Sequence, residues 1–86
     1  MRITRQTVAE KIADYLHHKI SLTELVDWAE RSICDAELTE GDEKILVRVL
    51  AQIGVADVRT FGLTWEDCEQ LLGMVGFAPR VEVVAA

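Results

Sequence analysis

Two adjacent histidines are the first residues in the chain that suggest chemistry. His18 follows Asp14 by four residues within an expected helix, a spacing at which two side chains can share a metal ion. A zinc site needs at least three protein ligands, however, and His17 and His18 point about 100° apart on a helix. We therefore predict no metal site and interpret the histidines as a polar helix face near a C-terminus, where cationic side chains suit the helix dipole.

Other residues that could carry out catalysis or bind ions are isolated from one another. Ser21 and Ser32 lack the flanking glycines of a nucleophile elbow, and the five glycines are too scattered for a phosphate-binding loop. An EF-hand loop counted from Asp35 needs Gly at its sixth position and Glu at its twelfth, but these positions hold Glu40 and Leu46. We predict no enzymatic activity and no cofactor.

Cys34 and Cys68 are the only cysteines, and neither belongs to a C-x-x-C pair. A small secreted domain usually contains more cysteines, so we expect buried free thiols in a cytoplasmic protein. The sequence leaves open whether the two cysteines form a disulfide, because it does not give the distance between them. The apolar runs are only a few residues long, so we expect no membrane span.

Negative charge is concentrated in one continuous part of the chain. The net charge is −6, yet residues 24–43 alone contain eight acidic side chains and one basic side chain. This block is either a solvated surface or a docking surface for a basic protein partner. The second interpretation assigns partner binding to Glu30, Asp35, Glu37 and Glu40.

The basic residues at the start of the chain allow a different function. Arg2, Arg5, Lys11 and Lys19 give the first 23 residues a small positive charge, and a small regulator could contact nucleic acid through them. The acidic second helix would be repelled from a DNA groove, so nucleic-acid binding is the alternative and not the leading hypothesis.

Apolar residues at steps of three and four predict four helices in one domain spanning residues 1–86. The expected helices are Val8–Lys19, Leu22–Cys34, Glu40–Ile53 and Trp65–Val75, with a short helical turn at Ala56–Phe61. Their N-caps are expected at Thr7, Ser21, Thr39 and Thr64. Gly54 and Gly76 are expected to end the third and last helices.

Residues 80–84 are β-branched and roughly alternating, which predicts one short C-terminal strand. Its backbone needs a partner. We favour Arg2–Thr4 in an intramolecular ribbon; the alternatives are a second copy in a homodimer, a different protein, or a loose tail. In a dimer, Val81 and Val83 would cover apolar surface.

On the second helix we expect Ile33 to face inward, whereas Trp28 falls at the edge of the apolar stripe. Val47 and Met74 point away from the stripes of their own helices. We assign these last three side chains to a partner-binding surface: Trp28, Val47 and Met74. A self-sufficient monomer is the alternative. The sequence thus predicts an all-α fold, a compact bundle of four main helices plus a short helical turn, with the strand at 80–84. The leading functional hypothesis is a non-enzymatic acidic protein-interaction module, such as an antitoxin- or immunity-like inhibitor of a basic partner.

Overall fold

The computed structural model describes residues 2–35, 37–58, 63–80 and 83–85. These residues form a mostly helical fold with a small parallel sheet. The elements in chain order are β1 (Arg2–Ile3), α1 (Arg5–Leu16), α2 (Leu22–Asp35), β2 (Glu37–Leu38), α3 (Glu43–Gly54), the 3₁₀ helix η1 (Ala56–Val58) and α4 (Trp65–Met74).

Helix α1 begins three residues earlier than predicted. Its N-cap is Thr4, whose Oγ1 accepts a hydrogen bond from the Thr7 backbone N–H at 3.0 Å, while Thr7 Oγ1 accepts one from the Thr4 N–H at 3.3 Å. The prediction of Thr7 as N-cap was therefore wrong, because Thr7 occupies the third helical position of a capping box that begins at Thr4.

Helix α1 also ends earlier than predicted, at Leu16. His18 adopts a left-handed φ of 61°, and its N–H donates to Tyr15 O at 3.1 Å while the Lys19 N–H donates to Asp14 O at 2.8 Å. These two bonds make a Schellman motif, in which the left-handed residue is usually glycine. The structural role of His18 is thus to end α1.

The predicted caps of α2 and α4 are confirmed. The Ser21 hydroxyl accepts a hydrogen bond from the Glu24 N–H at 3.1 Å, and the Glu24 carboxylate accepts one from the Ser21 N–H at 3.2 Å. Thr64 and Asp67 make the same reciprocal pair at 3.1 and 3.0 Å. These bonds satisfy backbone donors that a helix start otherwise leaves unpaired.

The predicted cap of α3 at Thr39 was wrong. Helix α3 has Asp42 as its N-cap, without a side-chain capping bond. The Thr39 hydroxyl and backbone N–H both donate to Ile3 O, at 2.9 and 3.0 Å, so this side chain extends the sheet contact instead. Gly54 lies inside α3 and not beyond its end, whereas Gly76 has the predicted left-handed conformation, with φ of 89°.

The structure contradicts the prediction of a strand over residues 80–84. Arg80 and residues 83–85 are not in a strand, and residues 81 and 82 lie outside the described residues. The predicted ribbon between Arg2–Thr4 and this segment is replaced by a parallel pair of β1 and β2, in which Arg2 lies opposite Glu37 and Ile3 opposite Leu38. Ile3 is fully buried, and the opposite charges of the other pair suit neighbouring strands.

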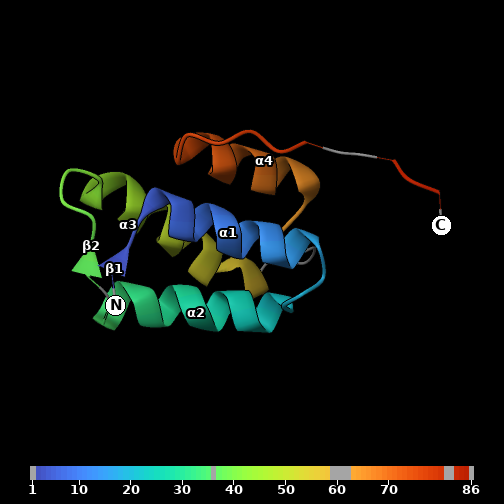
Figure 1. The fold of residues 1–86 in the computed structure, drawn as a ribbon. Helices are drawn as coiled ribbons and strands as arrows, with labels where there is room; N and C mark the ends of the chain where they lie inside the picture. The colour runs from blue at the N-terminus through green and yellow to red at the C-terminus, as the bar shows by residue number, and fades with distance from the viewer. Residues whose placement is uncertain (1, 36, 59–62, 81–82, 86) are drawn as a thin grey trace.

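The core lies where the four helices meet. In Figure 1, α1 lies between α2 and α4, while α2 and α3 make the most extensive contact and α3 also contacts α4. The largest fully buried side chains from the helices include Ile12, Leu25, Leu46, Leu50 and Ile53. No helix among the described residues has the length and apolar character needed to cross a bilayer.

Candidate functional site

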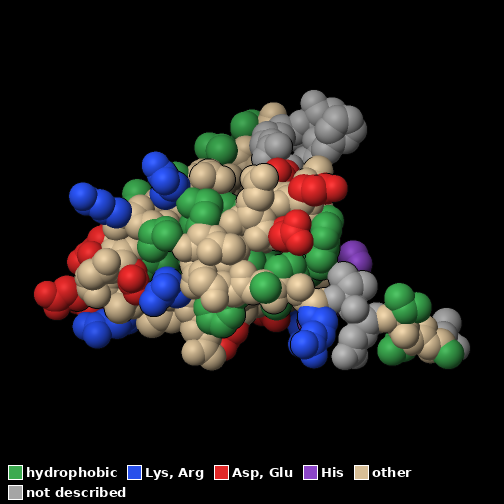
Figure 2. All heavy atoms as spheres, turned by 90° about the horizontal axis from the view of Figure 1, so that it is seen from above, with side chains coloured by type: hydrophobic (Ala, Val, Ile, Leu, Met, Phe, Trp, Pro, Cys, Tyr) green, Lys and Arg blue, Asp and Glu red, His purple; other side chains and the backbone are tan. Residues whose placement is uncertain are grey.

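The four acidic residues assigned to partner binding are all exposed and form what we call the acidic edge: Glu30, Asp35, Glu37 and Glu40. Asp35 is at the end of α2, Glu37 is in β2 and Glu40 is in the turn before α3. Glu30 is set back from this end, because it lies further back on α2, where its side chain is beside Gly54 at the far end of α3. Figure 1 places the end of α2, both strands and the start of α3 at one end of the molecule. Figure 2 shows acidic side chains at that end, interleaved with Lys and Arg.

Two arginines form ion pairs with carboxylates at this end of the molecule. Arg2 lies 3.8 Å from the Glu37 carboxylate, and Arg5 lies 3.3 Å from the Asp42 carboxylate. Across the described parts of the chain, Glu30, Asp35 and Glu40 make no ion pair. The acidic edge therefore retains three exposed carboxylates that are available to a cationic group from outside.

Ile33 is an exposed apolar residue on this edge that the sequence analysis missed. It was expected to face inward on α2, but 42% of its surface is exposed. It follows Glu30 by three residues, so the two side chains are neighbours on the helix surface. The acidic edge thus includes an apolar side chain next to a carboxylate, the combination that typifies the centre and rim of protein interfaces.

Trp28 was assigned to the apolar partner-binding surface, and this assignment was wrong. Only 7% of Trp28 is exposed, and Lys11 Nζ lies 5.7 Å from the centre of its ring. Helix α2 is rotated so that Trp28 and Ser32 face the core while Ile33 faces outward. A tryptophan removes more apolar surface from water than an isoleucine does, which favours this rotation.

The structure separates the other residues of the predicted apolar surface. Val47 is exposed on α3, as predicted, with 44% of its surface accessible. Met74 is partly buried and packs against the core, so its assignment to an exposed surface was wrong. Val83 is 96% exposed and belongs to no strand, so its predicted strand pairing was also wrong. Val81 lies outside the described residues.

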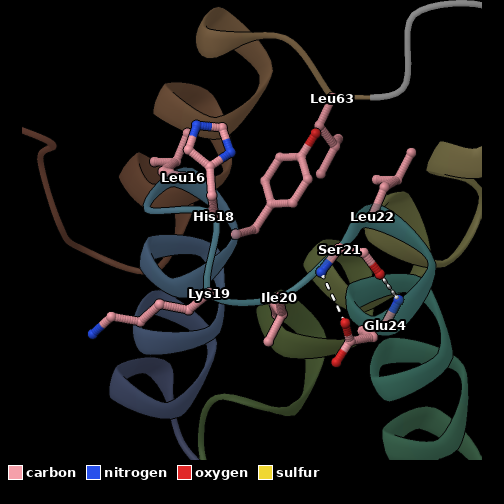
Figure 3. Close-up of a pocket in the computed structure, with 9 residues that line it drawn as sticks. Leu16, His18, Lys19, Ile20, Ser21, Leu22, Glu24 and Leu63 are labelled. Carbon is pink, nitrogen blue, oxygen red and sulfur yellow. Dashed lines mark hydrogen bonds between the residues drawn. The ribbon is translucent and has the colours of Figure 1, made fainter.

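A shallow groove lies beside the connection between α1 and α2 (Figure 3). Its volume is about 570 Å³, and it is lined by residues that include Tyr15, His18, Lys19, Ser21 and Glu24. Figure 3 shows Ser21 and Glu24 engaged with each other in the capping box, while the Lys19 side chain extends away from them. The polar groups do not converge on a common point, so this groove lacks the arrangement that catalysis requires.

A second groove, of about 590 Å³, lies between α1, α4 and the segment that follows α4. We call it the α1–α4 groove. Ala9, Ala13 and Leu72 line it, together with Trp65 and Phe77, which are 41% and 43% exposed. The groove is mainly apolar, and this character fits a docking segment better than a polar substrate.

A Schellman motif at the end of α4 forms one wall of the α1–α4 groove. Gly76, with its left-handed φ of 89°, donates its N–H to Gly73 O at 3.1 Å, and the Phe77 N–H donates to Leu72 O at 2.9 Å. This turn reverses the chain, so that residues 77–80 run back along α4 (Figure 1). In the sequence, this turn is indicated by Gly76, which is followed by an apolar residue and, two positions further on, by Pro79.

Both cysteines are free, and they differ in burial. Cys34 is exposed, which corrects the expectation that both thiols are buried. Burial raises the pKa of the Cys68 thiol to about 11, and the negative charge of Asp67 adds to this effect. Burial also raises the pKa of the Tyr15 hydroxyl, with a smaller contribution from Cys68. Neither group is an activated nucleophile, because activation requires a lowered pKa.

Raising the pH from about 9 to about 11 is expected to destabilise the folded protein through Cys68. Its pKa is 9.0 in the absence of the fold and about 11 within it, so the stabilisation is fully present below pH 9 and is lost as the pH rises through 11. The expected loss is about 2 kcal/mol. Urea unfolding across this range should show a steeper decline for wild type than for Cys68→Ala. Equal slopes would contradict a buried neutral thiol.

Among the described residues, no group of three or more His, Cys, Asp or Glu side chains is placed to hold a metal ion. Comparisons with protein-family models, with curated proteins and with solved structures found no match to this chain. Functional interpretation therefore depends on the acidic edge and the two grooves.

Proposed function

We propose that this chain is a non-enzymatic protein-interaction module that binds a basic partner on its acidic edge. The observation that supports this most is the exposure of Glu30, Asp35 and Glu40, which have no ion-pair partner in the described ranges. The exposed Ile33 beside Glu30 adds an apolar contact. Surface carboxylates of this kind attract a cationic partner over long range and increase the rate of association.

The ion pairs that the chain makes with itself indicate how a partner would bind. Arg2 and Arg5 lie against Glu37 and Asp42, at 3.8 and 3.3 Å. Arginine is well suited to such contacts because its planar group can donate two hydrogen bonds to one carboxylate. The partner is therefore a protein with an Arg- or Lys-rich surface that surrounds an apolar residue, which would contact Ile33.

An inhibitor of the antitoxin or immunity class is one concrete form of this function. Such a protein acts by covering a basic surface of its target, so it needs surface complementarity and no catalytic residues. A small acidic domain with a rigid helical frame meets this requirement.

The alternative function, nucleic-acid binding through the basic start of the chain, has less support. Arg2 and Arg5 both lie against carboxylates, and Lys11 lies over the Trp28 ring. Arginines that contact carboxylates of their own chain release fewer counterions from a phosphate backbone. We expect the protein to pass through an immobilised-DNA column at low salt without retention.

Reversing the acidic edge to lysine is expected to weaken the binding of basic peptides at least tenfold. A displayed peptide library selected on the wild-type protein should yield sequences that combine Arg or Lys with an apolar residue. The variant Glu30→Lys, Asp35→Lys, Glu37→Lys and Glu40→Lys should bind a synthetic peptide of that sequence at least tenfold more weakly. The remaining affinity should depend less on salt, because fewer ion pairs contribute. Titration by fluorescence anisotropy at several salt concentrations measures both quantities.

A second variant separates the position of the charges from their sum. Reversal to lysine at the exposed residues Glu10, Asp57, Glu66 and Glu69 gives the same net charge while leaving the acidic edge intact. This control should keep most of the affinity and the full salt dependence. Exposed charges contribute little to folding, so both variants should melt close to the wild type. Equal loss of binding in the two variants would contradict the proposal and would mean that the acidic edge is only a solvated surface.

A further inference from the structure

Among the described residues, strand β2 is paired with β1 on one side only. In this two-stranded sheet Ile3 lies opposite Leu38, and the Thr39 N–H donates to Ile3 O at 3.0 Å. Successive residues of a strand direct their backbone groups to opposite sides. Because Thr39 faces β1, the N–H and C=O of Leu38 point away from β1. We call these two groups the outer edge of β2.

The outer edge of β2 is accessible to another chain. Figure 1 shows β2 at the left-hand end of the molecule, beside β1. Within the ranges that the structure describes, no hydrogen bond joins another element to the N–H or C=O of Leu38. The Leu38 side chain is partly buried against the core, whereas Glu37 before it is exposed. An unpaired strand edge of this kind is a template for an additional strand.

Strand β1 shows which residues suit the side chains of β2. It places a basic residue, Arg2, opposite Glu37. It also places an apolar residue, Ile3, opposite Leu38. The Arg2 guanidinium lies 3.8 Å from the Glu37 carboxylate. A strand added on the other side of β2 would meet the same two side chains in the same rows of the sheet, so a basic residue next to an apolar residue suits it too.

Unpaired carboxylates near the outer edge favour a cationic strand. Asp35 precedes β2 and Glu40 follows it. Both are exposed, and neither makes an ion pair with the residues that the structure describes. An added strand that is longer than β2 would extend toward these carboxylates, where lysine or arginine side chains would complement their charge.

We propose that the basic partner adds an extended segment to the outer edge of β2, as a third strand of the sheet. An apolar residue of that segment lies beside Leu38 and covers its exposed part, and an adjacent lysine or arginine lies beside Glu37. The backbone of the segment makes hydrogen bonds with the N–H and C=O of Leu38. This inference rests on the proposed function, because it assigns a conformation and a sequence pattern to the same basic partner.

A capped synthetic peptide, Lys-Arg-Ile-Arg-Lys, is the probe, because its single apolar residue defines one register on β2. Fluorescence anisotropy of the labelled peptide measures its affinity. Leu38→Pro should weaken binding at least tenfold, since proline removes the N–H of the outer edge. The fold should tolerate proline here, because this N–H makes no bond to β1. Leu38→Ala is the matched control, because it keeps the N–H and should weaken binding by less.

Methylation of single backbone nitrogens in the peptide tests the same contact without changing the protein. In an antiparallel addition the isoleucine N–H donates to Leu38 O, whereas in a parallel addition the N–H of the arginine that follows it does. One of these two methylated peptides should therefore bind at least tenfold more weakly than the unmodified peptide. The other should bind like the unmodified peptide, because its methyl group points away from β2.

Three results would overturn strand addition. The first is a wild-type protein that does not bind the peptide, and the second is equal affinity of Leu38→Pro and Leu38→Ala. The third is equal affinity of the two methylated peptides, because strand addition requires them to differ. Circular dichroism and melting establish that both variants fold. If Leu38→Pro does not fold, the methylated peptides decide the question alone.

Failure of strand addition is distinguishable from failure of the proposed function. Reversal of the acidic edge tests the function with peptides selected from a library. If that reversal weakens their binding while one of the three results above is obtained, the partner binds the acidic edge without forming a strand. If the reversal has no effect on them, the proposed function itself is wrong.

Discussion

Replacing Trp28 with alanine is expected to lower the free energy of unfolding by about 3–5 kcal/mol. Trp28 is 93% removed from solvent, since 7% of its surface is exposed, and it belongs to the core shared by the helices. Its loss leaves a cavity and removes the ring that Lys11 covers at 5.7 Å. Urea unfolding monitored by circular dichroism measures the change.

Trp28→Phe is the matched control for this substitution. Trp28 Nε1 is buried and has no hydrogen-bond partner among the described residues, so phenylalanine removes an unsatisfied donor while keeping most of the apolar ring. The expected cost is about 1 kcal/mol, well below that of alanine. If Trp28→Ala lowers the free energy of unfolding by less than about 1 kcal/mol, Trp28 is not part of the core and the sequence-based assignment to the surface is correct.

Leu50→Ala is expected to cost about 2–5 kcal/mol, through lost burial and the cavity left behind. Leu50 is fully buried at the centre of the apolar stripe of α3. A domain of this size has a total stability of roughly 0.05–0.15 kcal/mol per residue, so the loss is a large part of the whole. Val58→Ala, at an 81% exposed site, should cost less than about 0.5 kcal/mol. Equal melting temperatures for the two variants would contradict the packing described for α3.

The helices could be predicted because their signals are local. Reciprocal capping at Ser21 and Thr64 and the apolar spacing around Leu50 depend on residues within a few positions of one another. The start of α1 was misplaced because Thr4 and Thr7 both qualify as caps, and the choice between them depends on local bonds. Such boundary errors arise from local chemistry that offers two similar solutions.

The rotation of α2 could not be predicted from its apolar pattern alone. Counting apolar positions places Ile33 on the inward stripe and Trp28 at its edge. The structure buries Trp28 and exposes Ile33 at 42%. The outcome depends on the space that α1 and α3 leave for a large ring, and this is a property of packing between elements.

The acidic edge was predicted from composition, whereas the α1–α4 groove was not. Charge density along the chain locates Glu30 and its neighbours without any knowledge of the fold. The groove requires that Phe77 turn back beside α1, which depends on the left-handed Gly76 and on where α4 lies. Only the turn has a sequence signal, because the position of α4 follows from tertiary contacts.

Strand β1 was predicted with the wrong partner, and β2 was missed. Arg2–Ile3 and Glu37–Leu38 are too short to show the alternation that identifies a strand. The predicted strand over 80–84 has the alternation but lacks a partner within the described residues. Strand propensity is therefore weak evidence without a neighbouring edge.

The parallel pairing of β1 with β2 has a consequence for how the chain folds during its synthesis. The Thr39 hydroxyl donates to Ile3 O across a separation of 36 positions, so this contact closes a loop that contains α1 and α2. Closing a long loop costs conformational entropy, whereas helices form from neighbouring residues. On a ribosome, Ile3 leaves the exit tunnel before residues 37–39 and stays without its partner until they have left it too. The strand that is synthesised before α1 and α2 is therefore fixed in place after them.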